Sequence, residues 1–160
     1  QVANAAGKVL AGCFDSTSVG YVVTVETKGI PIALMTAQAI GVPLVIARRD
    51  NRVTEGSAVN INFLSGSTGR IQTMSLSKRA MERGAGVLII DDFMKAGGTA
   101  RGMVDLMKEF DAKVVGIGVM ITTTKPEEKL VSNYIPLMYL EEVDEKAGRV
   151  SIRPNDRLPI

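Results

Sequence analysis

Two adjacent carboxylates, Asp91 and Asp92, lie between an apolar run and a pair of glycines. The run from Val87 to Ile90 is aliphatic and has no polar alternation, which is typical of a strand covered on both faces in a parallel sheet. The carboxylates then fall at the carboxyl end of that strand, where open α/β sheets bind their ligands. The segment therefore predicts a ligand site at this edge of a sheet.

The turn after the carboxylates predicts a phosphate site. Gly97 and Gly98 allow the backbone to turn tightly and to come close to a ligand, and Thr99 suits the N-cap of a helix that runs to Phe110. Backbone N–H groups at the positive end of a helix bind phosphate. The carboxylates would repel that phosphate unless they accept hydrogen bonds from hydroxyls at some distance or hold a divalent cation. A ribose 5-phosphate satisfies both conditions.

The same segment resembles the phosphoribosyl pyrophosphate (PRPP) motif of type I phosphoribosyltransferases. In the form DDFMKAGGT, with Lys95 in place of the usual small residue, it is similar to the bacterial purine operon repressors. The resemblance implies that Asp91 and Asp92 contact the ribose hydroxyls. It also implies that the following loop wraps the 5′-phosphate, through Lys95, Ala96, Gly97, Gly98 and Thr99. A flavodoxin-like or response-regulator domain also carries acids at a strand end, but the glycine turn that follows the acids favours the PRPP site.

A second strand–loop–helix unit of the same construction comes earlier in the chain. Residues 21–25 form an apolar, β-branched strand, and residues 30–40 follow as a helix with a proline in its first turn. By resemblance, the loop between them binds the pyrophosphate of PRPP through Thr27, Lys28 and Gly29. A lysine ammonium, backbone N–H groups and a helix N-terminus suit that anion. Without the resemblance, so short a motif is typical of a surface turn.

An arginine-rich stretch, residues 48–52, follows a buried-type strand at residues 43–47. It is consistent with either a solvated face or an anion clamp. By resemblance to the family, we expect Arg49 to face the pyrophosphate.

The remaining segments complete an α/β fold. We expect helices at residues 2–14, 77–83 and 125–134, an antiparallel hairpin at residues 59–63 and 71–76, and strands at residues 114–121, 136–140 and 150–152. Alternating strands and helices predict a mostly parallel central sheet flanked by helices. The resemblance makes this a type I phosphoribosyltransferase-like domain over residues 1–160, with the hairpin as a small antiparallel arm and the last strands as a C-terminal hood.

Composition excludes several classes of function. Cys13 is the only cysteine and there is no histidine, which excludes a disulfide framework, a zinc finger and a histidine general base. A lone cysteine suits a reducing cytoplasm. No apolar run approaches the ~20 residues that span a bilayer, and no signal-peptide pattern is present, so the sequence predicts a cytoplasmic protein without membrane contact.

The formal net charge of +2 is too small to predict nucleic-acid binding by this chain. The repressors carry an N-terminal winged-helix domain that these residues do not contain, and operator DNA would be bound through it. The chain also starts at Gln1, without an initiator Met and inside an expected helix, so we expect it to be a fragment. By resemblance, we expect a homodimer.

Two functions fit these residues. The first is a PRPP-sensing, non-catalytic domain of a repressor of purine biosynthesis genes, and the second is a catalytic purine phosphoribosyltransferase. Transfer to a purine needs groups that fix the base, and the hood offers only Tyr134 and Tyr139 as aromatic residues, either of which also suits core packing. Sparse hood aromatics and Lys95 favour the sensor. We expect no cofactor beyond the Mg²⁺ carried by PRPP, and guanosine tetraphosphate is a plausible competing ligand.

Overall fold

The structure is a computed structural model that describes residues 1–49, 57–65 and 69–159. Its elements are α1 (Val2–Gly12), a short 3-10 helix (Ser16–Ser18), β1 (Tyr21–Val25), α2 (Ile30–Ile40), β2 (Leu44–Ala47), β3 (Ala58–Leu64), β4 (Ile71–Ser77), β5 (Gly86–Met94), α3 (Gly98–Lys108), β6 (Lys113–Thr123), β7 (Tyr134–Asp144) and β8 (Arg149–Pro154). The described α-helices have 11 residues each, and none has the length and apolar character that a membrane crossing requires.

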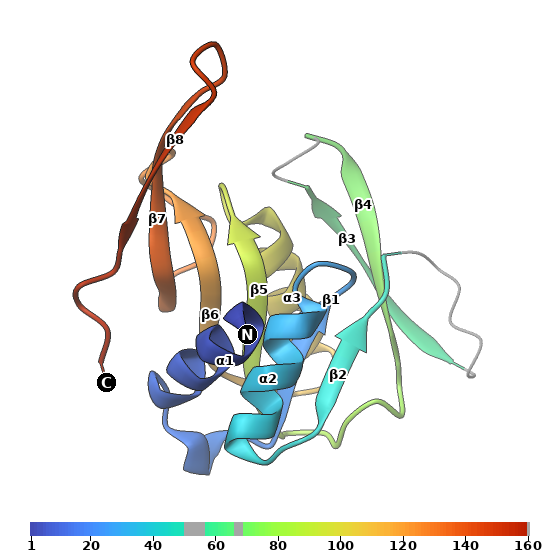
Figure 1. Cartoon of the computed structure of the whole chain (residues 1–160). Coiled ribbons are helices and arrows are strands. Elements are labelled where there is room, and N and C mark those ends of the chain that lie inside the picture. The colour runs from blue at the N-terminus through green and yellow to red at the C-terminus, as the bar shows by residue number, and fades with distance from the viewer. Residues whose placement is uncertain (50–56, 66–68, 160) are drawn as a thin grey trace.

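The central sheet has six strands in the order β2-β1-β5-β6-β7-β8. The first five strands in that order are parallel to their neighbours, and β8 pairs antiparallel with β7. A separate antiparallel pair, β3 and β4, lies beside the sheet (Figure 1) and is the predicted arm. The mostly parallel α/β fold is therefore confirmed.

Alternate residues of β5 belong to two hydrophobic cores on opposite faces of the sheet. Val87 and Ile89 pack in a cluster with residues of α3, β3 and β4, whereas Leu88 and Ile90 pack with α1 and α2. Figure 1 shows α1 and α2 in front of the sheet and α3 behind it. All four side chains are fully buried, and each contributes roughly 1.5–3 kcal/mol of hydrophobic free energy. Burial on both faces explains why this strand has no polar alternation.

Close contact between α3 and the arm depends on a glycine. A Cβ atom built on Gly102 would lie 2.8 Å from the Cβ of Phe63, which is itself buried in β3. Because Gly102 has no side chain, the phenyl ring packs directly against the helix backbone. The arm is thereby fixed beside the helix that begins at the predicted phosphate site.

Two predicted helices are wrong. Residues 78–85 form turns instead of a helix, and Gly84 there has the left-handed φ of 78°. Residues 125–133 form bends, with Asn133 at φ 58°. In this second segment Pro126 has no N–H to donate, and the N–H of Leu130 donates to the carbonyl of Ala96 at 2.8 Å. A contact with a distant loop thus replaces helical hydrogen bonding, which local periodicity cannot reveal.

Candidate functional site

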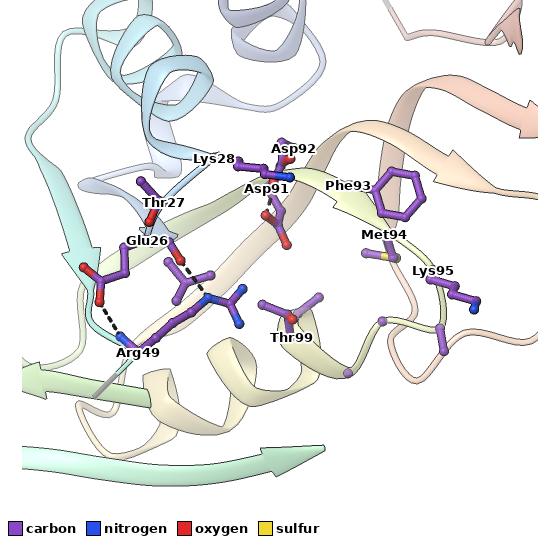
Figure 2. A pocket seen from close by; sticks show the side chains of 15 residues that line it. Glu26, Thr27, Lys28, Arg49, Asp91, Asp92, Phe93, Met94, Lys95 and Thr99 are labelled. Carbon is purple, nitrogen blue, oxygen red and sulfur yellow. Dashed lines mark hydrogen bonds between the residues drawn. The ribbon is translucent and has the colours of Figure 1, made fainter. Parts of the chain in front are cut away.

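A cavity of about 380 Å³ opens where the carboxyl ends of β1 and β5 meet the start of α3. Figure 2 shows the side chains around it. Its lining residues are Val25, Glu26, Thr27, Lys28, Arg49, Asp91, Asp92, Phe93, Met94, Lys95, Ala96, Gly97, Gly98, Thr99 and Ala100. Ten of the eleven residues that the sequence assigned to PRPP line this one cavity, and Gly29 is the exception. Their binding roles stay predictions, but the structure brings them together.

The glycine loop, residues 95–99, lines the cavity and contains backbone N–H groups without acceptors in the described part of the chain. Within the described residues, the N–H groups of Ala96 to Thr99 have no backbone or side-chain acceptor. The first N–H groups of a helix lack intrahelical partners and lie at its positive end, so they can donate to phosphate oxygens. This is the geometry that the glycine pair predicted.

Thr99 is not the N-cap of α3, contrary to the prediction. The cap is Gly97, at φ 86°, and no side chain caps the helix. Glycine adopts this left-handed conformation without the steric cost of a Cβ atom. The absence of a capping side chain leaves the N–H groups of the first turn available to a ligand.

Asp91 and Asp92 occupy different environments at the end of β5. Asp91 is 6% exposed, and its Oδ1 accepts a hydrogen bond from the backbone N–H of Asp92 at 2.9 Å. Burial, followed by the charge of Asp92, raises the pKa of Asp91 to about 7. Asp91 therefore carries only a partial charge near neutral pH, which weakens the repulsion of a phosphate nearby. When protonated, its carboxyl group can donate a hydrogen bond to a hydroxyl.

Gly29 lies beside the cavity and lets the lysine loop, residues 26–29, approach β1 closely. A Cβ atom on Gly29 would lie 2.6 Å from Oγ1 of Thr24 and 3.4 Å from Oδ1 of Asp91. Any side chain at this position would therefore push the loop away from the acidic pair. The hydroxyl of Thr24 is fully buried and has no hydrogen-bond partner among the described residues.

Arg49 is fixed by two residues that the sequence analysis missed, Glu26 and Gln72. The backbone N–H of Arg49 donates to Oε1 of Glu26, and its Nε donates to the Glu26 carbonyl, both at 2.7 Å. Its Nη1 donates to Oε1 of Gln72 on β4 at 2.8 Å. With these bonds in place, the guanidinium points into the cavity (Figure 2). The only sign of this arrangement in the sequence is an acid, Glu26, directly after the strand that leads into the lysine loop.

The two lysines of the predicted site lie differently. Figure 2 shows the side chain of Lys28 beside the acidic pair, whereas the ammonium of Lys95 points away from the centre of the cavity. Both residues line the cavity. The cavity therefore contains two cationic side chains, Lys28 and Arg49, together with the two carboxylates, and the charge of Arg49 acts on Asp91.

The predicted hood does not reach this cavity. No residue of β6, β7 or β8 is among the residues that line it. The Tyr139 ring is covered by the Arg153 guanidinium, whose central carbon lies 4.2 Å from the ring centre, and Arg153 also donates to Glu141. The aromatic residue that does line the cavity is Phe93, which is 42% exposed and which the sequence analysis did not single out.

Within the described chain, no group of three or more metal-binding side chains comes together. The acidic pair supplies two carboxylates. Magnesium is commonly bound through one or two protein carboxylates together with substrate phosphates. Asp91 and Asp92 therefore fit a magnesium ion that arrives with a phosphorylated ligand better than an ion held by the protein alone.

Comparisons with known proteins agree with this geometry. The family model described as "Phosphoribosyl transferase domain" matches residues 1–155. The chain is 50% identical over 153 residues to the purine biosynthesis transcriptional repressor PurR of Bacillus subtilis (strain 168), covering 96% of this chain and 54% of that protein. It is 32% identical over 160 residues to the xanthine phosphoribosyltransferase of Lactococcus lactis subsp. lactis (strain IL1403), covering 98% and 81%.

Among solved structures, the adenine phosphoribosyltransferase of Rhodothermus marinus shares the fold. The TM-score is 0.74 at 22% sequence identity, with 85% of this chain and 78% of the other covered. At this identity the likeness concerns the fold alone. The chain spans about half the length of the curated repressor that it matches.

Proposed function

This chain belongs to the phosphoribosyl transferase domain family, and from that membership we propose that its cavity binds PRPP. The observation that supports the proposal is that two loops whose groups suit anions line one cavity with the acidic pair. The glycine loop offers free N–H groups at the start of α3, and the lysine loop offers Lys28 with Arg49 beside it. A ligand with a phosphate at one end, hydroxyls in the middle and a pyrophosphate at the other end matches this order.

The proposed role is regulatory. PRPP bound here would change how an attached DNA-binding domain engages the operators of purine biosynthesis genes. The support is the identity of 50% to a protein named as a repressor of those genes, of which this chain covers about half.

The domain would act as a homodimer in the cytoplasm. Sedimentation as a monomer at micromolar concentration would contradict the dimer, and operator-selective DNA binding by these 160 residues alone would contradict the role of a separate DNA-binding domain.

A catalytic purine phosphoribosyltransferase is the second candidate, and the likeness to a xanthine phosphoribosyltransferase favours it. Turnover requires a purine base fixed over the anomeric carbon of PRPP. Phe93 is the aromatic group at the described cavity, and the hood strands contribute nothing to its lining. We therefore propose sensing without transfer. A nucleotide with the same phosphate pattern, such as guanosine tetraphosphate, would compete for the loops.

Calorimetric titration with PRPP and Mg²⁺ tests the site. Replacing both acids, Asp91→Asn with Asp92→Asn, should weaken PRPP binding at least about tenfold, since the ribose hydroxyls and the magnesium lose their carboxylate partners. The matched control replaces another adjacent pair, Glu127→Gln with Glu128→Gln, whose side chains are exposed and outside the cavity. Equal affinity in parent, variant and control would refute the site assignment.

A further inference from the structure

We infer that Lys129, outside the cavity, is a positioning residue that keeps the glycine loop in its phosphate-binding shape. This inference rests on the proposed function of the loop. Lys129 lies in the β6–β7 connection, residues 124–133, which replaces the helix that the sequence predicted. The connection packs against the loop, and none of its residues lines the cavity.

Three consecutive carbonyl groups, those of Met94, Lys95 and Ala96, accept hydrogen bonds from the end of β6 and from the connection. The Met94 carbonyl accepts from the hydroxyl of Thr122 at 3.1 Å, and the Ala96 carbonyl accepts from the N–H of Leu130 at 2.8 Å. Between them, the Lys95 carbonyl accepts from the Lys129 ammonium at 2.6 Å. With its carbonyls bonded away from the ligand, the loop can present its N–H groups to the cavity.

The ammonium of Lys129 uses its full donor capacity in this arrangement. Besides the Lys95 carbonyl, it lies 2.8 Å from the Thr123 carbonyl and 3.3 Å from Thr123 Oγ1. The Thr123 hydroxyl lies 2.6 Å from the Lys125 carbonyl and 3.3 Å from the Lys95 carbonyl. Donation to the nearer carbonyl leaves its lone pairs for the ammonium. An ammonium has three protons and here it meets three acceptors. Such use of a long side chain costs rotamer entropy, which distinguishes Lys129 from a solvated surface lysine.

The connection and the glycine loop are also in van der Waals contact. A Cβ atom on Gly97 would lie 3.4 Å from the Leu130 nitrogen and 3.7 Å from the Lys129 Cβ, so the connection lies directly against the turn of the loop. Burial at this contact lowers the pKa of Lys129. Hydrogen bonds to carbonyl groups therefore compensate for the water that the ammonium loses. Lys129 does not line the cavity, so it would act on the ligand through the loop.

The test compares Lys129→Met with Lys125→Met, which removes the same charge from an exposed side chain of the same connection. Ribose 5-phosphate and inorganic pyrophosphate are titrated separately into the parent and both variants. Lys129→Met should weaken ribose 5-phosphate binding about tenfold relative to Lys125→Met, the scale of one charge-assisted hydrogen bond. Pyrophosphate binding at the lysine loop should not change. Equal affinity of the two variants for ribose 5-phosphate would overturn the inference, as would an equal loss for both ligands in Lys129→Met.

A measurement without ligand separates this inference from the proposed function. NMR order parameters of the Ala96 to Thr99 amides should fall in Lys129→Met from roughly 0.85, typical of rigid backbone, towards the range below roughly 0.6. They should stay high in Lys125→Met. If the parent binds no ribose 5-phosphate, the proposed function fails, and the order parameters still decide the inference: unchanged values in Lys129→Met overturn it. Lys129→Gln serves as the second variant, with the same expectation, if Lys129→Met does not fold.

Discussion

Asp91 is a buried carboxylate that contributes to the cavity at a cost in stability. Its pKa of about 7 lies above the ordinary value of 3.8, because burial and then the charge of Asp92 disfavour the ionised form. A raised pKa of an acid in the folded state means that the native protein binds more protons than the unfolded chain between these two values. The free energy of unfolding contributed by Asp91 is therefore full below about pH 4 and decreases as the pH rises towards 7.

Asp91→Asn should remove this pH dependence, because an amide of the same shape does not ionise. We expect the variant to be close to the parent in stability at pH 4 and more stable at pH 8, by roughly 3 to 4 kcal/mol. Urea unfolding at both pH values measures the difference. The control is Asp156→Asn, which replaces an exposed acid near the end of the chain. A variant that is less stable than the parent at pH 8 would show that ionised Asp91 is a stabilising group.

Among individual residues, the sequence identified the groups that line the cavity but not those that orient them. Asp91, Asp92 and the glycine loop could be predicted because one short segment carries them all. Glu26 and Gln72 could not, since their contacts with Arg49 join β1, β2 and β4, and the order of those strands is not written in local spacing. The orientation of Lys95 depends in the same way on the path of the loop (Figure 2).

Among the elements, the start of α3 carries the proposed phosphate site, and two glycine substitutions test its role. Gly97 and Gly41 both have φ 86°, so an alanine at either position incurs the same left-handed strain. Each substitution should lower the free energy of unfolding by about 1 kcal/mol or more. Only Gly97→Ala should also weaken ribose 5-phosphate binding, since Gly97 forms the turn of the glycine loop and any relief of its strain would move the N–H groups at the start of α3, whereas Gly41 lies at the far end of α2.

Thermal unfolding and calorimetric titration of Gly97→Ala and Gly41→Ala provide the two measurements. Comparable destabilisation with a binding defect confined to Gly97→Ala is the expected pattern. A similar loss of affinity in both variants would mean that the conformation of the glycine loop has no specific role.

At the element scale, prediction succeeded where periodicity reflects burial. The apolar run of β5 and the alternation in β3 are direct consequences of how each strand is covered. Prediction failed at residues 125–134, where polar composition suggested an exposed helix. There the backbone and Lys129 bind carbonyl groups more than 25 residues away in sequence, and only the packed structure reveals that competition.

The whole molecule combines a fold shared with enzymes and a cavity whose described lining comes from β1, β5, the two loops, Arg49 and the start of α3. The parallel sheet follows from the order of strands and helices, and the family resemblance follows from the acidic pair and the glycine turn after it, so both could be predicted from the sequence. The order of strands and helices does not show whether the C-terminal strands extend to the cavity. β7 and β8 pair at the edge of the central sheet and extend beyond the body of the protein (Figure 1), away from the lining of the cavity. Our account of sensing without transfer rests on that separation.

Phosphorus NMR measures PRPP binding and pyrophosphate release in the same samples, and so tests binding and transfer together. The protein is mixed with Mg²⁺, PRPP and, in turn, adenine, guanine, hypoxanthine, xanthine and orotate, and the resonances of PRPP and free pyrophosphate are followed with time. Our account predicts that the PRPP resonances shift or broaden on adding protein and that no pyrophosphate forms above the control without protein. Base-dependent release of pyrophosphate that disappears when Asp91→Asn and Asp92→Asn are combined would contradict the account and establish a phosphoribosyltransferase.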